Sequence, residues 1–127
     1  MTLPRGGHDR AVVRGVGVVQ AIMGAALMLR PAAAATWIAG AGGPAIPTGL
    51  ARLLGSRLTA QAVAELARPT RGVALAGAAI DGSHALSMLL PFAYDRRYRR
   101  AALINATAAT ATAATLAIAA RRGWADR

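Results

Sequence analysis

Residues 80–92 read IDGSHALSMLLPF and place two ionisable residues, Asp81 and His84, inside an otherwise apolar segment. An earlier apolar segment, residues 50–67, carries a single arginine near its centre, Arg57. Ionisable side chains within long apolar segments are rare and need a partner when they are buried. We therefore interpret Arg57 as the partner of the polar residues in the later segment.

A tight turn is expected at the tripeptide Arg-Pro-Thr that contains Pro69, because proline ends helices and favours turns. Asp81 lies 12 residues after Pro69, and Arg57 lies 12 residues before it. At a rise of about 1.5 Å per residue, each lies roughly 18 Å from the turn. That distance is near the middle of a hydrocarbon layer about 30 Å thick. The spacing predicts two membrane-spanning helices with an Arg57–Asp81 pair at matched depth.

Composition supports a membrane protein of one domain. The chain has 127 residues, of which 55% are hydrophobic, and it contains no cysteine, which excludes disulfides and cysteine-ligated metals. The net charge of +10 comes entirely from arginines, and these gather at the ends of apolar segments. They form no continuous basic face with interleaved aromatic residues. The lipid bilayer is therefore the expected partner, and nucleic acid is not.

The apolar runs predict an all-α fold, a four-helix transmembrane bundle that forms a single membrane domain. The four helices are expected at residues 11–29, 49–67, 71–92 and 101–120. Residues 1–10 are polar and glycine-rich, so we expect them to fray.

The first connection, residues 30–48, is apolar but rich in proline and glycine, so it cannot be one regular helix. We predict a short interfacial helix around residues 32–39, anchored by Trp37 and followed by a loop. A re-entrant segment is the alternative. The basic start and apolar core before residues 32–35 also resemble a cleaved signal peptide, but Arg30 and the proline after it argue against cleavage.

Small residues predict how the second and third predicted helices pack. Ala74, Ala78 and Gly82 recur every four residues, a spacing that lets helix backbones approach closely in lipid. We therefore predict a close hairpin of these two helices. Glu65 and Arg68 are three residues apart near the turn and are expected to form a solvated surface pair.

Nearly all aromatic residues fall at predicted helix ends, where an interfacial belt would place them. They are Trp37, Phe92, Tyr94, Tyr98 and Trp124. This distribution favours a membrane bundle over a soluble one.

The candidate site is a polar centre within the predicted bundle. Asp81 and His84 are three residues apart and share a helix face. Folding the last helix back on the third places threonines near the depth of Asp81. The predicted centre comprises Arg57, Gln61, Asp81 and His84, with Gln20, Asn105, Thr110 and Thr112 as outer members. One aspartate and one histidine are too few ligands for a metal, and we predict no metal, no cofactor and no catalytic residue.

Two segments carry a resemblance. RLLGSRLTAQA at residues 52–62 and DGSHALSM at residues 81–88, with the basic loop before an alanine-rich last helix, resemble small uncharacterised four-helix integral membrane proteins of actinobacterial type. The layout is also similar to DoxX-like membrane proteins. The resemblance covers residues 50–120 and implies four spans and pairing of Arg57 with Asp81 and His84, but no activity.

From these features we expect a non-enzymatic structural or accessory subunit of the cell membrane that associates with further copies or with a partner membrane protein. The alternative is a small oligomeric proton-coupled transporter or channel that uses Asp81 and His84. A membrane-embedded enzyme is a third hypothesis. Eight arginines on the side of both termini, against six on the other side, favour cytoplasmic termini.

Overall fold

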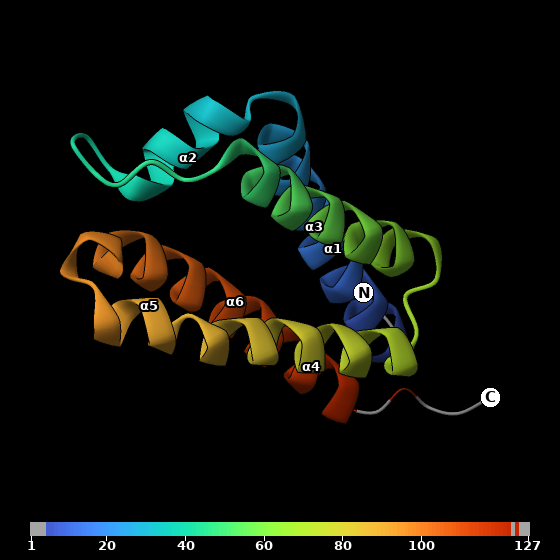
Figure 1. Cartoon of the computed structure of the whole chain (residues 1–127). Helices are drawn as coiled ribbons and strands as arrows, with labels where there is room; N and C mark the ends of the chain where they lie inside the picture. Colours follow the sequence, from blue (N-terminus) through green and yellow to red (C-terminus); the bar gives the residue numbers. More distant parts are fainter. Residues whose placement is uncertain (1–4, 123, 125–127) are drawn as a thin grey trace.

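The computed structural model describes residues 5–122 and Trp124. In this part of the chain the fold is entirely helical, which confirms the predicted class (Figure 1). The helices are α1 (Arg5–Leu29), α2 (Pro31–Ala39), α3 (Thr48–Ala67), α4 (Arg71–Ser87), α5 (Leu89–Tyr94), the 3-10 helix η1 (Arg96–Tyr98) and α6 (Arg99–Arg121).

The first helix begins earlier than predicted. Helix α1 starts at Arg5, so the prediction of a frayed start is wrong from that residue onward, while residues 1–4 lie outside the described residues. Asp9 is only 4% exposed, and the guanidinium of Arg10 lies 5.7 Å from the centre of the Trp124 ring. Contacts with the end of the chain therefore hold this polar first part of α1.

The proline- and glycine-rich connection forms the short helix predicted there, followed by a loop. Pro31 occupies the first turn of α2, where its missing N–H leaves no hydrogen bond unmade. The helix ends at Gly40, whose φ of +83° favours glycine, and Gly42 has a φ of +74°. Trp37 is 68% exposed on α2.

The helix predicted over residues 71–92 is divided at Met88 into α4 and α5. Pro91 explains the break, because it donates no hydrogen bond and its ring crowds the carbonyl of Ser87 four residues earlier. The chain resumes a helical course immediately, so α4 and α5 run on in nearly one direction (Figure 1).

The long helices pack as two pairs, α1 with α3 and α4 with α6. Consecutive α3 and α4 touch at few places, so the predicted close hairpin of these two helices is wrong. A Cβ built on Gly82 would meet no atom within 4 Å. A Cβ on Gly24 of α1, in contrast, would lie 2.6 Å from Thr59 Oγ1 and 2.9 Å from the Gly55 carbonyl oxygen of α3. The close backbone approach is therefore between α1 and α3.

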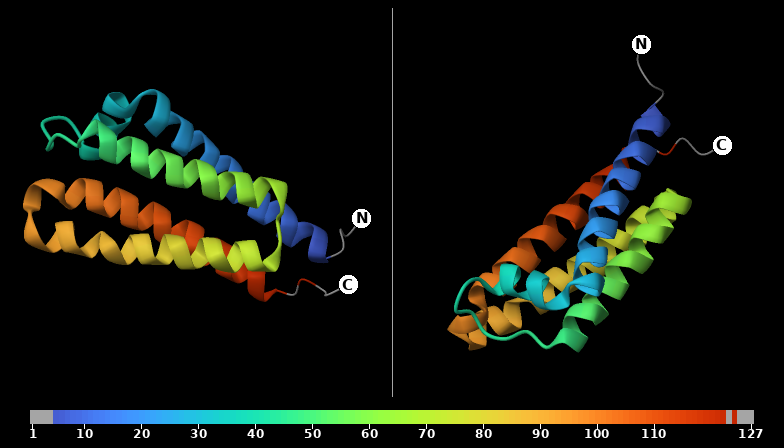
Figure 2. Two further views of the ribbon diagram at one scale, coloured as in Figure 1. Left: turned by 45° about the vertical axis from the view of Figure 1, so that its right-hand side comes forward. Right: turned by 90° about the horizontal axis from the view of Figure 1, so that it is seen from above.

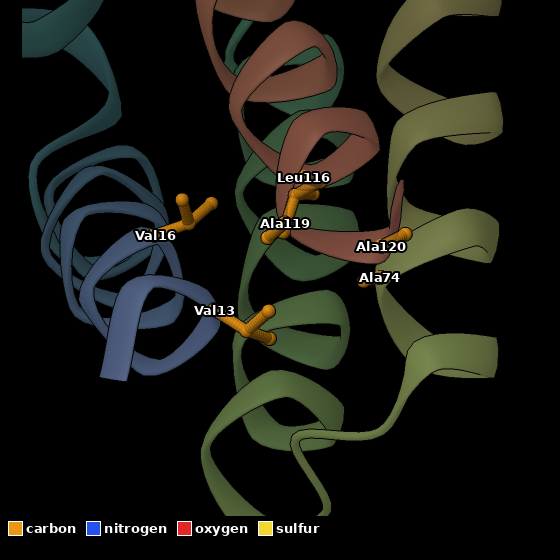
Figure 3. Close-up of a cluster of buried hydrophobic side chains, with 6 residues drawn as sticks. All are labelled: Val13, Val16, Ala74, Leu116, Ala119 and Ala120. Carbon is orange, nitrogen blue, oxygen red and sulfur yellow. The ribbon is translucent and has the colours of Figure 1, made fainter. Parts of the chain in front are cut away.

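Two apolar clusters form the core, and the larger one joins the two helix pairs. The larger lies where α1, α4 and α6 meet, and it comprises Val13, Val16, Ala74, Leu116, Ala119 and Ala120 (Figure 3). The smaller lies between α1 and α3 and comprises Leu27, Ala51 and Leu58. The start of α1 and the end of α6 lie at one end of the molecule, and α2 and α5 lie at the other (Figure 2).

Within the part of the chain that the structure describes, three stretches are long and apolar enough to cross a membrane: Gly7–Leu29, Arg71–Tyr94 and Arg96–Arg121. Only 33%, 17% and 22% of the residues in their most apolar windows are buried, so most of their apolar surface faces outward. Such a surface is typical of a protein in contact with lipid. Helix α3 is not among the three, because Arg52, Arg57 and Glu65 lower its mean hydropathy.

Candidate functional site: a buried carboxylate that joins four helices

Asp81 of α4 is 1% exposed and accepts four hydrogen bonds from the three other long helices. Its Oδ1 accepts from Arg57 Nη2 at 2.7 Å. Its Oδ2 accepts from Thr112 Oγ1 at 2.7 Å, from Gln20 Nε2 at 2.9 Å and from Gln61 Nε2 at 3.2 Å. We call these five residues the Asp81 hub. It connects α1, α3, α4 and α6 at one point.

Helix geometry brings these side chains together. Arg57 and Gln61 are four residues apart, so they lie on one face of α3. Gly77 lies four residues before Asp81 on α4, and a Cβ there would stand 3.1 Å from Gln61 Nε2 and 2.8 Å from Leu116 Cδ1. The absence of a side chain at Gly77 therefore leaves room for the hub and for the core beside it.

Glu65 adds a second buried carboxyl group, which contradicts the predicted surface pair with Arg68. Its side chain is 0% exposed and accepts a hydrogen bond from Gln61 Nε2 at 3.1 Å. Four residues separate it from Gln61, so it shares the inward face of α3, whereas Arg68 is exposed. Among the described residues, Glu65 Oε2 and the side-chain oxygens of Gln20 and Gln61 have no hydrogen-bond partner.

The remaining predicted site residues lie outside the hub. Thr110 is exposed on α6. Asn105 donates to the backbone oxygen of Ala101 at 2.8 Å, in its own helix. His84 is half-buried, and its side chain makes no hydrogen bond to Asp81 among the described residues. His84 lies on the same side of α4 as Asp81, three residues further along, and takes no part in the hydrogen bonds that Asp81 accepts.

His84 and Asn105 instead line a cavity of about 750 Å³ between the two helix pairs. Its walls are almost entirely apolar and come from α1, α2, α3 and the α4–α6 region. Arg57 lines this cavity and also a second one of about 350 Å³ between α3 and α4. No motif in the sequence predicts this cavity. Pro91 and the irregular residues 40–47 are the sequence features that lie next to the cavity, since Pro91, Ile46 and Pro47 line it.

The charges of the hub balance, because the guanidinium of Arg57 faces the carboxyl group of Asp81. The side chain of Arg57 is 26% exposed. A hydrogen-bonded network of this kind fixes the relative positions of the groups that form it.

No protein-family model, curated protein or solved structure matches the chain.

Proposed function

We propose that this protein is an integral membrane protein that crosses the bilayer four times. Three candidate spans support this, and α3 has 20 residues and therefore a length of about 30 Å, which equals the hydrocarbon thickness. It runs beside α1 and returns the chain to the end at which α1 begins and α6 ends (Figure 2). Two of its three charged residues, Arg57 and Glu65, belong to the interior network, so its mean hydropathy understates how apolar its outer face is.

We place the protein in the cell membrane with both termini in the cytoplasm. The excess of arginines at the end with the termini supports this orientation. On the strength of residues 52–62 and 81–88, we also group it with the small four-helix membrane proteins of actinobacterial type.

The function that the geometry supports best is that of a structural or accessory subunit in which the hub clamps four helices. The observation that carries it is Asp81, which is 1% exposed and accepts hydrogen bonds from four side chains on three other helices. A group that carries protons needs access to a donor or to water, whereas a group that fixes helix register needs partners on each helix.

Helix α6 offers a surface for the partner. Its exposed residues include a stripe of small side chains: Thr107, Thr110, Ala111, Ala114 and Thr115. Small residues at this spacing favour close helix contacts in lipid. A second copy or another membrane protein would pack here.

The transporter alternative has one observation in its favour, which is that Arg57 and His84 both line the large cavity. In that case His84 would pass protons from the cavity to Asp81. The two functions predict opposite behaviour for variants of the Asp81 pair.

The deciding experiment measures thermal stability in detergent for Arg57→Gln, Asp81→Asn and the double variant. A clamp predicts a loss of about 3–5 kcal/mol for each single variant and a smaller loss for the double, because one buried charge without its partner is the costly state. Equal or higher stability of Asp81→Asn would contradict the clamp. A pH-dependent proton flux in reconstituted vesicles that Asp81→Asn abolishes would establish the transporter instead.

A further inference from the structure

The large cavity, lined by Arg57 and His84, has no role in the proposed clamp. Its volume of about 750 Å³ falls within the range of about 300–1,000 Å³ typical of ligand pockets. Leu50 and Leu53 on its α3 wall are 56% and 66% exposed, so the same side chains also form part of the lipid-facing surface. A molecule dissolved in the bilayer can therefore reach the cavity without passing through water.

Polar groups gather at the part of the cavity nearest the hub. A guanidinium has five N–H groups, and among the described residues only Nη2 of Arg57 has a partner, Asp81. The imidazole of His84 also lines the cavity and can donate one hydrogen bond as a neutral ring. Asn105 and Tyr98 are the other polar side chains in walls that are mostly apolar. The donors of Arg57 and His84 favour a ligand group that accepts hydrogen bonds.

Charge decides which acceptor fits. Arg57 and Asp81 already neutralise each other at 2.7 Å, and the carboxyl group of Glu65 is buried next to the hub. A ligand carboxylate would add an uncompensated negative charge to an apolar site, which is costly. An uncharged carbonyl accepts the same hydrogen bonds without that cost.

We propose that the large cavity binds a long-chain membrane amphiphile through an uncharged carbonyl group, which accepts hydrogen bonds from Arg57 and His84. The chain of the ligand lies against the apolar walls formed by α2, α3 and α6. This inference rests on the membrane location proposed above, but it is independent of the clamp.

The test uses the full chain in nanodiscs of diether phospholipids, which contain no carbonyl group to compete. The probes are 2-tridecanone, tridecane and tridecanoate, and the measurement is the midpoint of thermal unfolding. A specific site predicts that 2-tridecanone raises the midpoint more than either of the others. An equal shift with tridecane, or a larger one with tridecanoate, would overturn the proposal.

Matched variants locate the site. Leu54→Trp fills the cavity and should abolish the shift, whereas Leu103→Trp on the outer surface of α6 should preserve it. His84→Leu should weaken apparent affinity by about fivefold to tenfold, the effect of one hydrogen bond. A shift that survives both Leu54→Trp and the second filling variant Ala101→Phe would place binding elsewhere and overturn the proposal.

Mass spectrometry of an organic extract of the purified protein distinguishes the sources of the carbonyl. An ester lipid and a quinone each supply one, and either would support the proposal, whereas a free fatty acid as the bound species would contradict it. The two proposals can fail separately. If 2-tridecanone does not bind but the Arg57 and Asp81 variants lose stability as expected for a clamp, only the cavity site is refuted and the proposed function stands.

Discussion

At the scale of single residues, the two threonines predicted near Asp81 differ in what they contact. Thr112 donates to Asp81 Oδ2 at 2.7 Å, while Thr110 is exposed. Thr112→Val keeps the shape of the side chain but removes the donor, so we expect a loss of about 1.5–3 kcal/mol in the free energy of unfolding. Thr110→Val is the matched control and should leave stability unchanged. Denaturation in detergent measures both, and equal effects would contradict the hub.

Glu65 provides a second test at this scale. Its buried side chain fills space and accepts a hydrogen bond from Gln61, so Glu65→Ala should cost about 1–3 kcal/mol in the free energy of unfolding. Arg68 is exposed, so Arg68→Ala should change stability by less than about 0.5 kcal/mol. If Glu65 and Arg68 formed a surface ion pair instead, both variants would lower the free energy of unfolding by the same small amount. Thermal unfolding of the two variants distinguishes these cases.

The pairing of Arg57 with Asp81 was predictable because the two residues are equidistant from Pro69 and depth along a helix depends only on residue number. Rotation about the helix axis was harder to assign. Glu65 has both Arg68 and Gln61 within one turn, and only the packing of α3 decides which faces inward. His84 shares a helix face with Asp81, as its three-residue spacing predicted, but this spacing does not decide which side chains bond to the carboxyl group.

At the scale of helices, two glycines predict opposite outcomes for the same substitution. A Cβ on Gly55 would lie 2.9 Å from the Gly24 carbonyl oxygen and 2.9 Å from Leu27 Cβ, whereas one on Gly82 would lie in open space. We expect Gly55→Ala to lower the free energy of unfolding by about 1–3 kcal/mol because α1 and α3 must separate.

Gly82→Ala serves as the control for this prediction. Alanine favours helix over glycine, so stability should stay equal or rise by up to about 1 kcal/mol. Thermal unfolding in detergent measures both variants. If Gly82→Ala were the damaging change, the close contact would lie between α3 and α4 and the observed pairing would be wrong.

The existence of the long helices followed from apolar runs between prolines and arginines, but their pairing did not. Small residues recur on α4, yet those that pack closely are seven apart on α1 and α3: Gly17 and Gly24, and Gly55 and Ala62. That repeat was available in the sequence. To decide which small-residue face packs closely, one must know which bulky side chains lie opposite each face. Those neighbours are set by the packing of all the helices.

At the scale of the molecule, the number of crossings is testable because the chain has no natural cysteine. Cysteines introduced at exposed His8, Ala41, Arg68 and Arg96 can be labelled with a membrane-impermeant maleimide in intact cells. Four crossings with cytoplasmic termini predict labelling at positions 41 and 96 only.

A chain in which α3 does not cross would give a different pattern. Position 68 would then label together with position 41, and position 96 would behave like position 8. Permeabilised cells, in which all four positions should react, control for the accessibility of each cysteine. The opposite pattern throughout would keep four crossings but reverse the orientation.

The separation of Arg57 from Asp81 by 24 residues has a consequence for biosynthesis. Helix α3 leaves the ribosome first, and a central arginine costs about 2.5–3.5 kcal/mol when a helix partitions alone from the insertion machinery into lipid. The carboxyl group that offsets this cost arrives only with α4. In the arrangement of four crossings proposed above, insertion of α3 is therefore expected to wait for α4, so that the two helices enter the bilayer together. In the folded protein α3 packs along α1 and α4 packs along α6, and the bonds of Arg57 and Gln61 to Asp81 keep α3 and α4 connected.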